Sequence, residues 1–256
     1  MFRESEAADL GLAGRVALVT GGTRGVGRAV ARRLCAAGCH VVLNYANSAD
    51  QARRTVEELS GLKGSATAVS GDISRPKALA AVLDTVHRDH GGLDIFVHNA
   101  SSWHPMATLH PDGGGFRADL ATALTPLVFG APALRRLMAG RPGRIIAVSS
   151  SGARRVVDGY LGLGMAKAAL ESLVRYLAVE LAPTGVAVNA VSTAKVDKGT
   201  DDPRPDLVRT LAARTPAGRL TTPEDVANVV ALLCTDEAGW LQGQVITVDG
   251  GLALRA

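Results

Sequence analysis

Residues 15–28 read RVALVTGGTRGVGR and join three local patterns in a fixed order. Residues 15–20, with the apolar run VALV at 16–19, are typical of a strand buried on both faces of a parallel sheet. A glycine-rich loop follows directly, and a helical pattern then continues to Ala37 and stops at Gly38. Glycines allow a tight turn, while a helix N-terminus offers free N–H groups and a partial positive charge. We therefore expect this segment to bind the pyrophosphate of a dinucleotide.

The remainder of the chain repeats the alternation of strand and helix. Further strands are predicted at 40–44, 65–70, 93–98, 145–148, 185–191 and 244–249. Helices are predicted at 49–59, 76–90, 116–138, 159–182, 206–213 and 223–234. This order predicts one α/β domain over residues 1–256, built on a single Rossmann-type, doubly wound, seven-stranded parallel sheet with helices on both faces. Residues 1–13 are predicted to be a loosely ordered lead-in, and residues 192–204 an irregular segment that covers the active site.

Composition excludes several classes of protein. The 28 basic and 24 acidic residues give a net charge of +4 without basic blocks, so nucleic acid is not an expected partner. No apolar run has the length of a membrane span, and residues 1–14 lack the apolar stretch of a signal peptide, so we expect a soluble, cytoplasmic protein without membrane contact. Cys35, Cys39 and Cys234 are expected to be buried, reduced thiols.

The end of the second predicted strand bears on the choice of cofactor. Sites that select NAD usually place Asp or Glu there to bind the ribose 2′-hydroxyl. This chain has the sequence NYANS at 44–48 instead, and Arg24 lies in the glycine loop. The pattern therefore predicts NADPH. Asp72, after the third strand, is either an acceptor for the adenine amino group or a helix-capping residue.

Tyr160 and Lys167 lie seven residues apart at the start of a predicted helix. Seven residues return a side chain to within about 20° of the same helix face, about 10.5 Å along the axis. Because helical side chains lean toward the N-terminus, Lys167 is expected to reach back toward the phenol and to lower its pKa from about 10. Tyr160 is then a candidate proton donor or oxyanion stabiliser. The alternative is a packing tyrosine and a solvated lysine.

Three histidines lie at 98, 104 and 110, in and beside the predicted loop 102–115. Their spacing matches no helical face and no zinc pattern, so no metal site is predicted.

Five motifs give the chain its resemblance to the short-chain dehydrogenase/reductase superfamily. They are TGGTRGVG at 20–27, the turn Asn99-Ala100, GRIIAVSS at 143–150, Lys167 within AKAAL, and VDGG at 248–251. The resemblance covers nearly the whole chain. It implies a hydride-transferring oxidoreductase with the predicted Rossmann-type sheet and with helices that pair between subunits of a homotetramer or homodimer.

The position of the tyrosine narrows the resemblance. Most of the superfamily has Tyr-x-x-x-Lys, which would place the tyrosine at position 163, where this chain has Leu163. The spacing Tyr160-x6-Lys167 resembles that of enoyl-acyl-carrier-protein reductases. The segments YLAVEL at 176–181, VNAVS at 188–192 and TPAGR at 215–219 are similar to the NADPH-dependent type III enzymes. The resemblance implies hydride transfer to the β-carbon of an α,β-unsaturated acyl thioester, carried by an acyl carrier protein or by coenzyme A.

The resemblance also implies roles for individual residues. Tyr160 would stabilise the enolate oxygen, Lys167 would hold the nicotinamide ribose, and Ser150 would be an accessory catalytic group. Trp103 and Met106 are expected at the mouth of an aliphatic acyl pocket. The residues expected to bind the cofactor are Gly21, Thr23, Arg24, Gly25, Gly27, Asn47, Asp72, Ile73, Asn99, Lys167 and Val196.

Other positions depart from the superfamily pattern. Asp119 stands where many relatives have an asparagine that helps a water-borne proton relay; it either accepts a hydrogen bond in that place or pairs with Lys167. Ser101 replaces a glycine, and Thr193-Ala194 replaces Pro-Gly. Lys195 and Lys198 are unusual charges beside a nicotinamide.

Three functional hypotheses remain open from the sequence. The leading one is an NADPH-dependent enoyl-thioester reductase. The second is a carbonyl reductase with a repositioned tyrosine, and the third is a cofactor-binding protein without turnover. Arg135, Arg136, Arg154 and Arg155 either receive an acidic carrier protein or coenzyme A phosphates, or are solvated surface residues.

Overall fold

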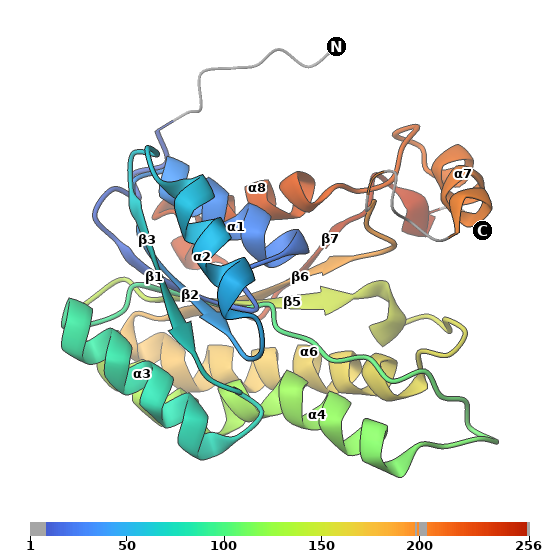
Figure 1. Cartoon of the computed structure of the whole chain (residues 1–256), viewed down its shortest axis with the longest axis horizontal. Coiled ribbons are helices and arrows are strands. Elements are labelled where there is room, and N and C mark those ends of the chain that lie inside the picture. The colour runs from blue at the N-terminus through green and yellow to red at the C-terminus, as the bar shows by residue number, and fades with distance from the viewer. Residues whose placement is uncertain (1–8, 198, 200–203, 255–256) are drawn as a thin grey trace.

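A seven-stranded parallel sheet forms the centre of the protein, as a computed structural model of residues 9–197, 199 and 204–254 shows (Figure 1). The strand order is β3-β2-β1-β4-β5-β6-β7. The strands are β1 Val16–Thr20, β2 His40–Tyr45, β3 Ser65–Ser70, β4 Ile95–His98, β5 Arg144–Ser150, β6 Ala187–Thr193 and β7 Val245–Val248. The predicted fold class is confirmed. Because the chain order reverses beside β1, the carboxyl ends of β1 and β4 border the crevice where such sheets bind ligands.

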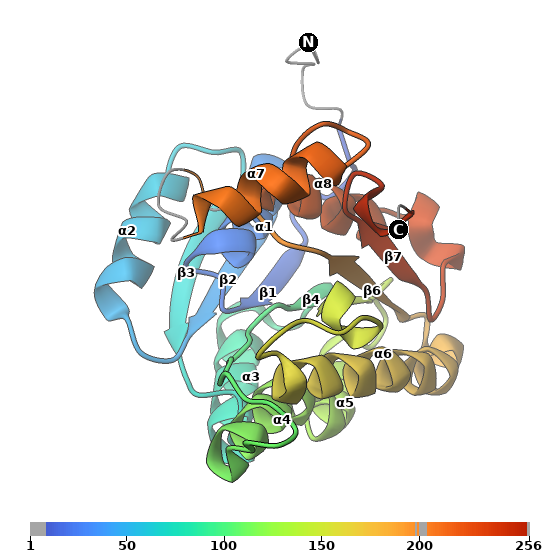
Figure 2. The same ribbon diagram turned by 90° about the vertical axis from the view of Figure 1, so that its right-hand side faces the viewer.

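Helices cover both faces of the sheet. The helices are α1 Gly25–Ala36, α2 Ala49–Leu59, α3 Pro76–His90, α4 Gly113–Val128, α5 Ala131–Leu137, α6 Leu161–Leu181, α7 Pro205–Arg214 and α8 Pro223–Leu233. In Figure 1, α1, α2 and α8 lie above the sheet, and α3, α4 and α6 lie below it. Figure 2 looks at the edge where α7 and the loop after β5 lie.

Each central strand contributes side chains to two hydrophobic cores, one on each face of the sheet. This explains why its sequence is apolar without alternation. In β1, Ala17 and Val19 pack in the core shared with α1 and α8. Val16 and Leu18 pack in the opposite core, with residues of α3, α5 and α6. All five residues of β1 are buried. Both faces of the sheet are therefore closed, and the strand ends are left to form the site.

The single helix predicted over 116–138 is wrong, because the structure divides it into α4 and α5. Pro132 lacks an N–H, and its ring would clash with the carbonyl of Val128 in a continuous helix. The helix also begins earlier than predicted. The carboxylate of Asp112 accepts hydrogen bonds from Gly114 N and Gly115 N, which caps a start made of three glycines.

The predicted lead-in is wrong for residues close to β1. Leu12 is fully buried in the core above the sheet, and its carbonyl accepts a hydrogen bond from Cys39 Sγ. Gly14 N donates to Gly38 O, which ties this segment to the start of β2. Residues 1–8 of the lead-in, and Lys198, lie outside the described residues.

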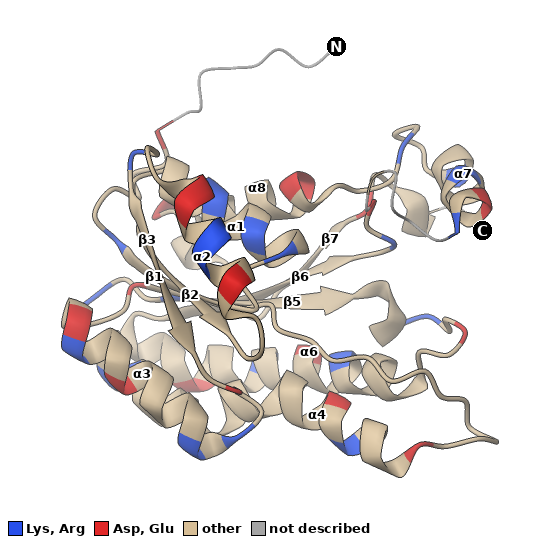
Figure 3. Ribbon diagram, in the orientation of Figure 1, with Lys and Arg blue, Asp and Glu red and all other residues tan. Residues whose placement is uncertain are grey.

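All three cysteines are buried and free, as predicted. They lie in the core above the sheet, where burial raises the pKa of each thiol to about 12. Among the described residues, no group of three His, Cys, Asp or Glu side chains could hold a metal ion. No helix in the part of the chain that the structure describes is long and apolar enough to cross a membrane. Basic and acidic residues lie interspersed on the helices (Figure 3).

Candidate active site

In the glycine loop between β1 and α1, position 27 has room only for glycine. A Cβ added to Gly27 would lie 2.1 Å from Gly21 O and 2.5 Å from Asn99 Nδ2. Helix α1 begins with Arg24 as its N-cap, which makes no side-chain capping bond, and its first turn contains no acidic residue. Its N-terminal N–H groups are therefore not satisfied by a cap, and an anion is favoured there. These residues fit the pyrophosphate of a dinucleotide.

Asn99 shapes this loop through its side chain. Asn99 Nδ2 donates to Thr20 O at 3.2 Å and to Gly21 O at 3.1 Å. Thr20 Oγ1 in turn accepts hydrogen bonds from Asn99 N and Ala100 N, each at 3.0 Å. The ends of β1 and β4 are thereby fixed together. Asn99 thus holds the shape of the glycine loop, and its part in cofactor binding stays a prediction.

The residues at the end of β2 and in the glycine loop differ in exposure. Asn44 is buried, and its amide donates to Val69 O and Gly71 O, so it is committed to the sheet. Asn47 and Arg24 are exposed, as a ligand contact requires. Thr23 is buried, and its carbonyl accepts from Thr55 Oγ1 at 3.1 Å.

The other three residues predicted to bind the cofactor, Asp72, Ile73 and Val196, lie in different surroundings. Asp72 Oδ1 accepts from Ser74 N at 3.1 Å and from Ser74 Oγ at 2.6 Å, so the carboxylate stabilises its own turn. Ile73 packs in the core below the sheet, which leaves only its backbone for a nucleotide. Val196 forms an isolated parallel bridge with Thr221 after β6.

Thr193, the last residue of β6, has the one buried side-chain oxygen among the described residues that lacks a hydrogen-bond partner. It pairs in register with Ser150, at the end of β5. A buried hydroxyl without a partner is costly, so this oxygen marks a place where a bound polar group would be stabilised. The position fits the amide of a nicotinamide at the carboxyl edge of the sheet.

Tyr160, Lys167 and Ser150 converge where β5 ends and α6 begins. Tyr160 is the N-cap residue of α6, and Ser150 is the last residue of β5. The ring of Tyr160 packs so closely on Gly152 that a Cβ there would lie 2.5 Å from Tyr160 Cε1. Lys167 is buried, and its Nζ donates to Val148 O at 2.7 Å.

The pKa of Tyr160 is raised above its usual range, and the prediction that Lys167 would lower it is wrong. Burial is the largest cause, a hydrogen bond with the Ser150 side chain opposes it, and the charge of Asp119 adds to it. Lys167 instead reaches toward the sheet carbonyl of Val148. The phenol of Tyr160 is therefore protonated at neutral pH and is suited to donating a proton.

Burial lowers the pKa of Lys167 to about 8. The pKa of His98 is lowered to about 3, chiefly by the burial of its ring and also by the charge of Lys167. His98 is thus neutral. Its ring nitrogens lie 3.0 Å from Thr20 Oγ1 and 2.9 Å from Ala123 O. Because Ala123 O can only accept, Nε2 carries the proton, and Nδ1 accepts from Thr20.

This pKa predicts a pH dependence. Turnover should fall as pH rises through about 8, because Lys167 then loses the charge that would hold the ribose. Unfolded lysine stays protonated to about pH 10.4, so between these values the contribution of Lys167 to the free energy of unfolding should rise with pH. The three buried thiols oppose it above about pH 8.5, because they ionise only in the unfolded chain. The difference in free energy of unfolding between the wild type and Lys167→Met, measured by urea unfolding, cancels the effect of the thiols and should increase across this range. A difference that does not change with pH would contradict the assignment.

Glu171 is a buried carboxylate that sequence reasoning missed. It accepts from Ser149 Oγ at 2.8 Å and from Arg154 Nε at 2.9 Å. Both donors flank Ser150, so Glu171 fixes the end of β5 and the loop that follows it. Its spacing of four residues from Lys167 on α6 was the available signal, because it places both side chains on one buried face.

Asp119 does not pair with Lys167. Its carboxylate is fully buried and accepts hydrogen bonds from Ser102 Oγ at 2.9 Å and His104 Nδ1 at 2.8 Å, both to Oδ1. The amide His104 N adds a bond to Oδ2 at 3.3 Å. The sequence had singled out Asp119 and His104 separately, but nothing in their spacing indicated the pair.

Trp103 and Met106 lie against the turn that leads to Tyr160. Trp103 Nε1 and Met106 N both donate to Gly159 O, at 3.1 and 3.2 Å. Met106 is buried and forms an isolated bridge with Tyr160, whereas about half of Trp103 is exposed. The structure therefore brings both predicted substrate residues next to the candidate catalytic tyrosine.

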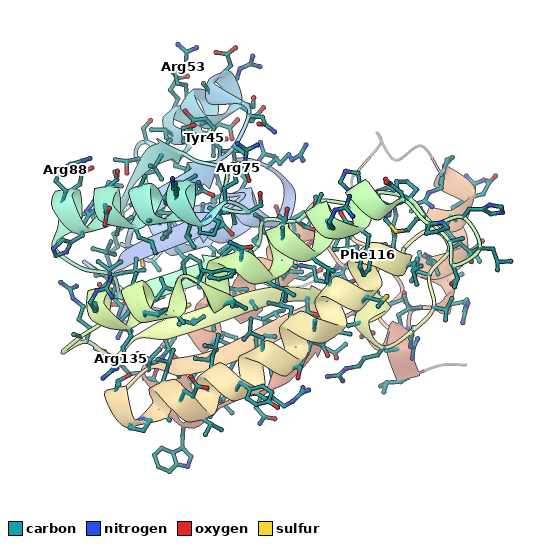
Figure 4. All side chains as sticks on the ribbon, turned by 90° about the horizontal axis from the view of Figure 1, so that it is seen from below. Tyr45, Arg53, Arg75, Arg88, Phe116 and Arg135 are labelled. Carbon is teal, nitrogen blue, oxygen red and sulfur yellow. The ribbon has the colours of Figure 1, made fainter. Side chains whose placement is uncertain are left out.

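A cavity of 510 Å³ adjoins Tyr160. Met106 and residues 107–108 line one side, residues 152–161 line the other, and α6 contributes Gly164, Met165 and Ala168. The lining includes Arg154 and Arg155 but not Trp103. Arg135, on α5, lies at the opposite end of the α4–α5 pair from Phe116 (Figure 4). The four arginines considered above are thus not one cluster.

Known proteins are similar to nearly the whole chain. Residues 21–253 match the family described as enoyl-(acyl carrier protein) reductase. The 1-cyclohexenylcarbonyl-CoA reductase of Streptomyces collinus is 39% identical over 94% of this chain and 88% of its own length. The 3-oxoacyl-acyl-carrier-protein reductase of Aquifex aeolicus is 32% identical, over 95% and 99% respectively.

A solved structure resembles the whole chain. It is a short-chain dehydrogenase from Burkholderia cenocepacia in complex with NADP, 32% identical, with a TM-score of 0.87 over 94% of this chain and 99% of that one. Since these similarities extend over nearly the full length of both proteins in each comparison, the chain belongs to the short-chain dehydrogenase/reductase superfamily of oxidoreductases.

Proposed function

We propose that the protein reduces the carbon–carbon double bond of an α,β-unsaturated acyl thioester with NADPH. The observation that carries this proposal is the position of Tyr160, at the N-cap of α6. Position 163, where most of the superfamily has its tyrosine, is occupied by Leu163, which is buried with Ala123 and Ala166 in a small apolar cluster. Tyr160 is therefore the group at this end of α6 that can serve as acid.

A tyrosine one turn earlier suits the charge that develops in enoyl reduction. When bound, NADPH would supply the hydride that the β-carbon receives. Negative charge then develops on the thioester oxygen, which is separated from the reduced carbon by two further carbons. The protonated phenol of Tyr160 can donate a hydrogen bond to that oxygen, and such a donor contributes about 3 kcal/mol in comparable sites.

Lys167 and Ser150 support Tyr160 in this mechanism. The hydrogen bond with Ser150 lowers the pKa of Tyr160 against the effect of burial, which keeps the phenol from becoming too weak an acid. Lys167 would hold the ribose hydroxyls beside β5, because its Nζ lies at the carbonyl of Val148. Two of its three protons remain for the cofactor.

The preference for NADPH is supported at the end of β2. No carboxylate stands between Asn44 and Ser48 to repel a ribose phosphate, and Arg24 is exposed in the glycine loop. The Burkholderia cenocepacia structure, which matches over nearly the whole chain, holds NADP.

A carbonyl reductase is the second candidate, and one of the relatives supports it. The Aquifex aeolicus protein is named a 3-oxoacyl reductase and matches 95% of this chain. In that reaction the oxygen is bonded to the reduced carbon itself, so Tyr160 would meet it only if the substrate lay about one turn nearer the start of α6.

The carrier of the acyl group is proposed to be anionic, either an acyl carrier protein or coenzyme A. Arg154 and Arg155 support this, because both line the cavity beside Tyr160. Arg154 is more than half exposed although it is paired with Glu171. Arg135, at the far end of the α4–α5 pair, is not part of this proposal.

A homo-oligomer is also part of the proposal. Tyr176 and Val179 on α6, and Val128 and Phe129 at the end of α4, are exposed apolar residues. They lie on the two helices that are expected to pair between subunits, so a second copy of the chain would cover them.

Parallel assays test the proposal. A crotonyl thioester and an acetoacetyl thioester are incubated with NADPH or NADH, cofactor oxidation is followed by absorbance, and products are identified by mass spectrometry. We expect butyryl thioester to form, and to form faster with NADPH. Turnover of the acetoacetyl thioester alone would establish the carbonyl reductase instead. Binding of NADPH without turnover of either compound, or of a wider panel, would support a protein without catalytic activity.

A further inference from the structure

We propose that Asp119 is a positioning residue that fixes residues 102–106, the segment whose last residue, Met106, lines the substrate site. It acts through Ser102 and His104, and the segment in turn sets Met106 against Tyr160. The inference rests on the proposed function only in that Met106 would face an acyl thioester. It replaces the role in a proton relay that the resemblance implies for an asparagine at this position.

The carboxylate of Asp119 is committed to one segment of chain. All three of its hydrogen bonds come from Ser102 and His104, at 2.8 to 3.3 Å, and its side chain is fully buried. A buried carboxylate is costly unless it is hydrogen-bonded, so departure of the segment would leave that charge without partners. Hydrogen bonds to a charged acceptor are also stronger than neutral ones. Asp119 therefore holds the segment on α4.

The same segment is fastened at its other end to the turn that carries Tyr160. Gly159 O accepts from both Trp103 Nε1 and Met106 N. Gly159 has a φ of +69°, a conformation that side-chain-bearing residues rarely adopt, so the turn itself is specified by glycine. Residues 102–106 thus bridge α4 and the start of α6.

Helix α6 is shaped to receive this bridge. A Cβ added to Gly162 would lie 2.9 Å from Met106 Cε and 3.1 Å from Asp119 Oδ2. The carboxylate and the methionine therefore press together on the first turn of α6, two residues after Tyr160. Because Met106 also lines the cavity, its position limits the space in which an acyl chain can lie.

Asparagine at position 119 would not replace the carboxylate. The amide oxygen of an asparagine could accept from His104 N, but Ser102 Oγ and His104 Nδ1 would then have to become acceptors of the NH₂ group. The charge-assisted bonds to Oδ1 would be replaced by weaker neutral ones. Asp119→Asn is therefore expected to release residues 102–106 without changing the volume of the side chain.

Fluorescence of Trp103 tests the inference independently of catalysis. The chain has two tryptophans, and Trp240 is 97% exposed, so Trp240→Phe leaves Trp103 as the only one. In this background, Asp119→Asn should shift the emission of Trp103 to longer wavelength and increase its quenching by acrylamide. Asp84→Asn removes an exposed carboxylate of α3 and should change neither. Thermal melting checks that each variant is folded.

Kinetics separate positioning from a purely structural role. Loss of one charge-assisted hydrogen bond should raise KM for the crotonyl thioester about tenfold. The dissociation constant of NADPH should stay unchanged, and kcat should fall much less than KM rises. Equal losses in NADPH affinity and in KM would overturn the proposal, since they would indicate a general disturbance of the fold.

Two substitutions of His104 decide how Asp119 acts. Asparagine can place an amide N–H where Nδ1 stood, so His104→Asn should keep the Trp103 emission and the KM of the wild type. His104→Leu lacks the donor and should match Asp119→Asn. If the asparagine variant were as impaired as the leucine variant, or if Trp103 were unaffected in Asp119→Asn, the proposal would be wrong. If neither thioester is reduced, the proposed function fails, but the fluorescence result still decides this inference.

Discussion

Tyr160→Phe is expected to lower kcat for the crotonyl thioester about 100- to 1000-fold, the loss found when one donor to a developing oxyanion is removed. The phenol is protonated at neutral pH because burial raises its pKa, so it can supply both a hydrogen bond and a proton. Ser150 is the neighbouring hydroxyl, but it lies on β5 and already accepts a hydrogen bond from Gly152 N. The residual activity should therefore be small.

A control variant shows whether the loss of activity is specific to the hydroxyl of Tyr160. Tyr176→Phe removes the hydroxyl of another tyrosine of α6, which is 68% exposed, and should leave kcat unchanged. NADPH binding, measured by fluorescence titration, should be equal in both variants and in the wild type. A Tyr160→Phe variant that kept more than about a tenth of wild-type kcat, a loss below 1.4 kcal/mol, would contradict a catalytic role for the phenol.

Gly27→Ala is expected to destabilise the protein by about 3 kcal/mol, the upper end of overpacking costs, and to abolish NADPH binding. The added Cβ would lie 2.1 Å from Gly21 O, and that carbonyl is held by Asn99. Backbone on one side and a bonded amide on the other leave no flexible group to move away. The glycine loop would have to open, and the turn that fits a pyrophosphate would be lost.

Gly25→Ala is the matched comparison, because it separates a steric contact from a strained backbone. Nothing lies within 4 Å of a Cβ at Gly25, but its φ is +51°. The cost should be about 1 to 2 kcal/mol, the penalty for a side chain in that conformation. Urea unfolding measures both variants. If Gly27→Ala were no less stable than Gly25→Ala, the contact with Gly21 O would not limit this position.

The sheet could be predicted from the sequence because its physical cause is local. Val16 to Val19 are apolar without alternation, as expected of a strand covered on both faces, and the helices between strands bring each next strand parallel. The break between α4 and α5 was visible as Pro132, but the apolar pattern on either side of it suggested one helix. There the missing N–H of proline outweighs periodicity.

The site was predictable only in part. The spacing of Tyr160 and Lys167 placed both at the start of one helix, but it could not show that a carbonyl of β5 would attract the lysine more closely than the phenol. Asp119 and His104 are separated by a loop that has no period, so their contact follows from how that loop crosses α4. Pairings of this kind depend on tertiary packing, which a single sequence does not encode as a pattern.

The buried thiols can report local opening of the core on one side of the sheet. Cys35, Cys39 and Cys234 all belong to the core that α1 and α8 share with the sheet, and at neutral pH none of them is a thiolate. An alkylating reagent can therefore reach them only when that core transiently separates. The rate at which the native protein reacts with such a reagent therefore measures how often the core between the sheet and helices α1 and α8 opens. No probe has to be added to the chain.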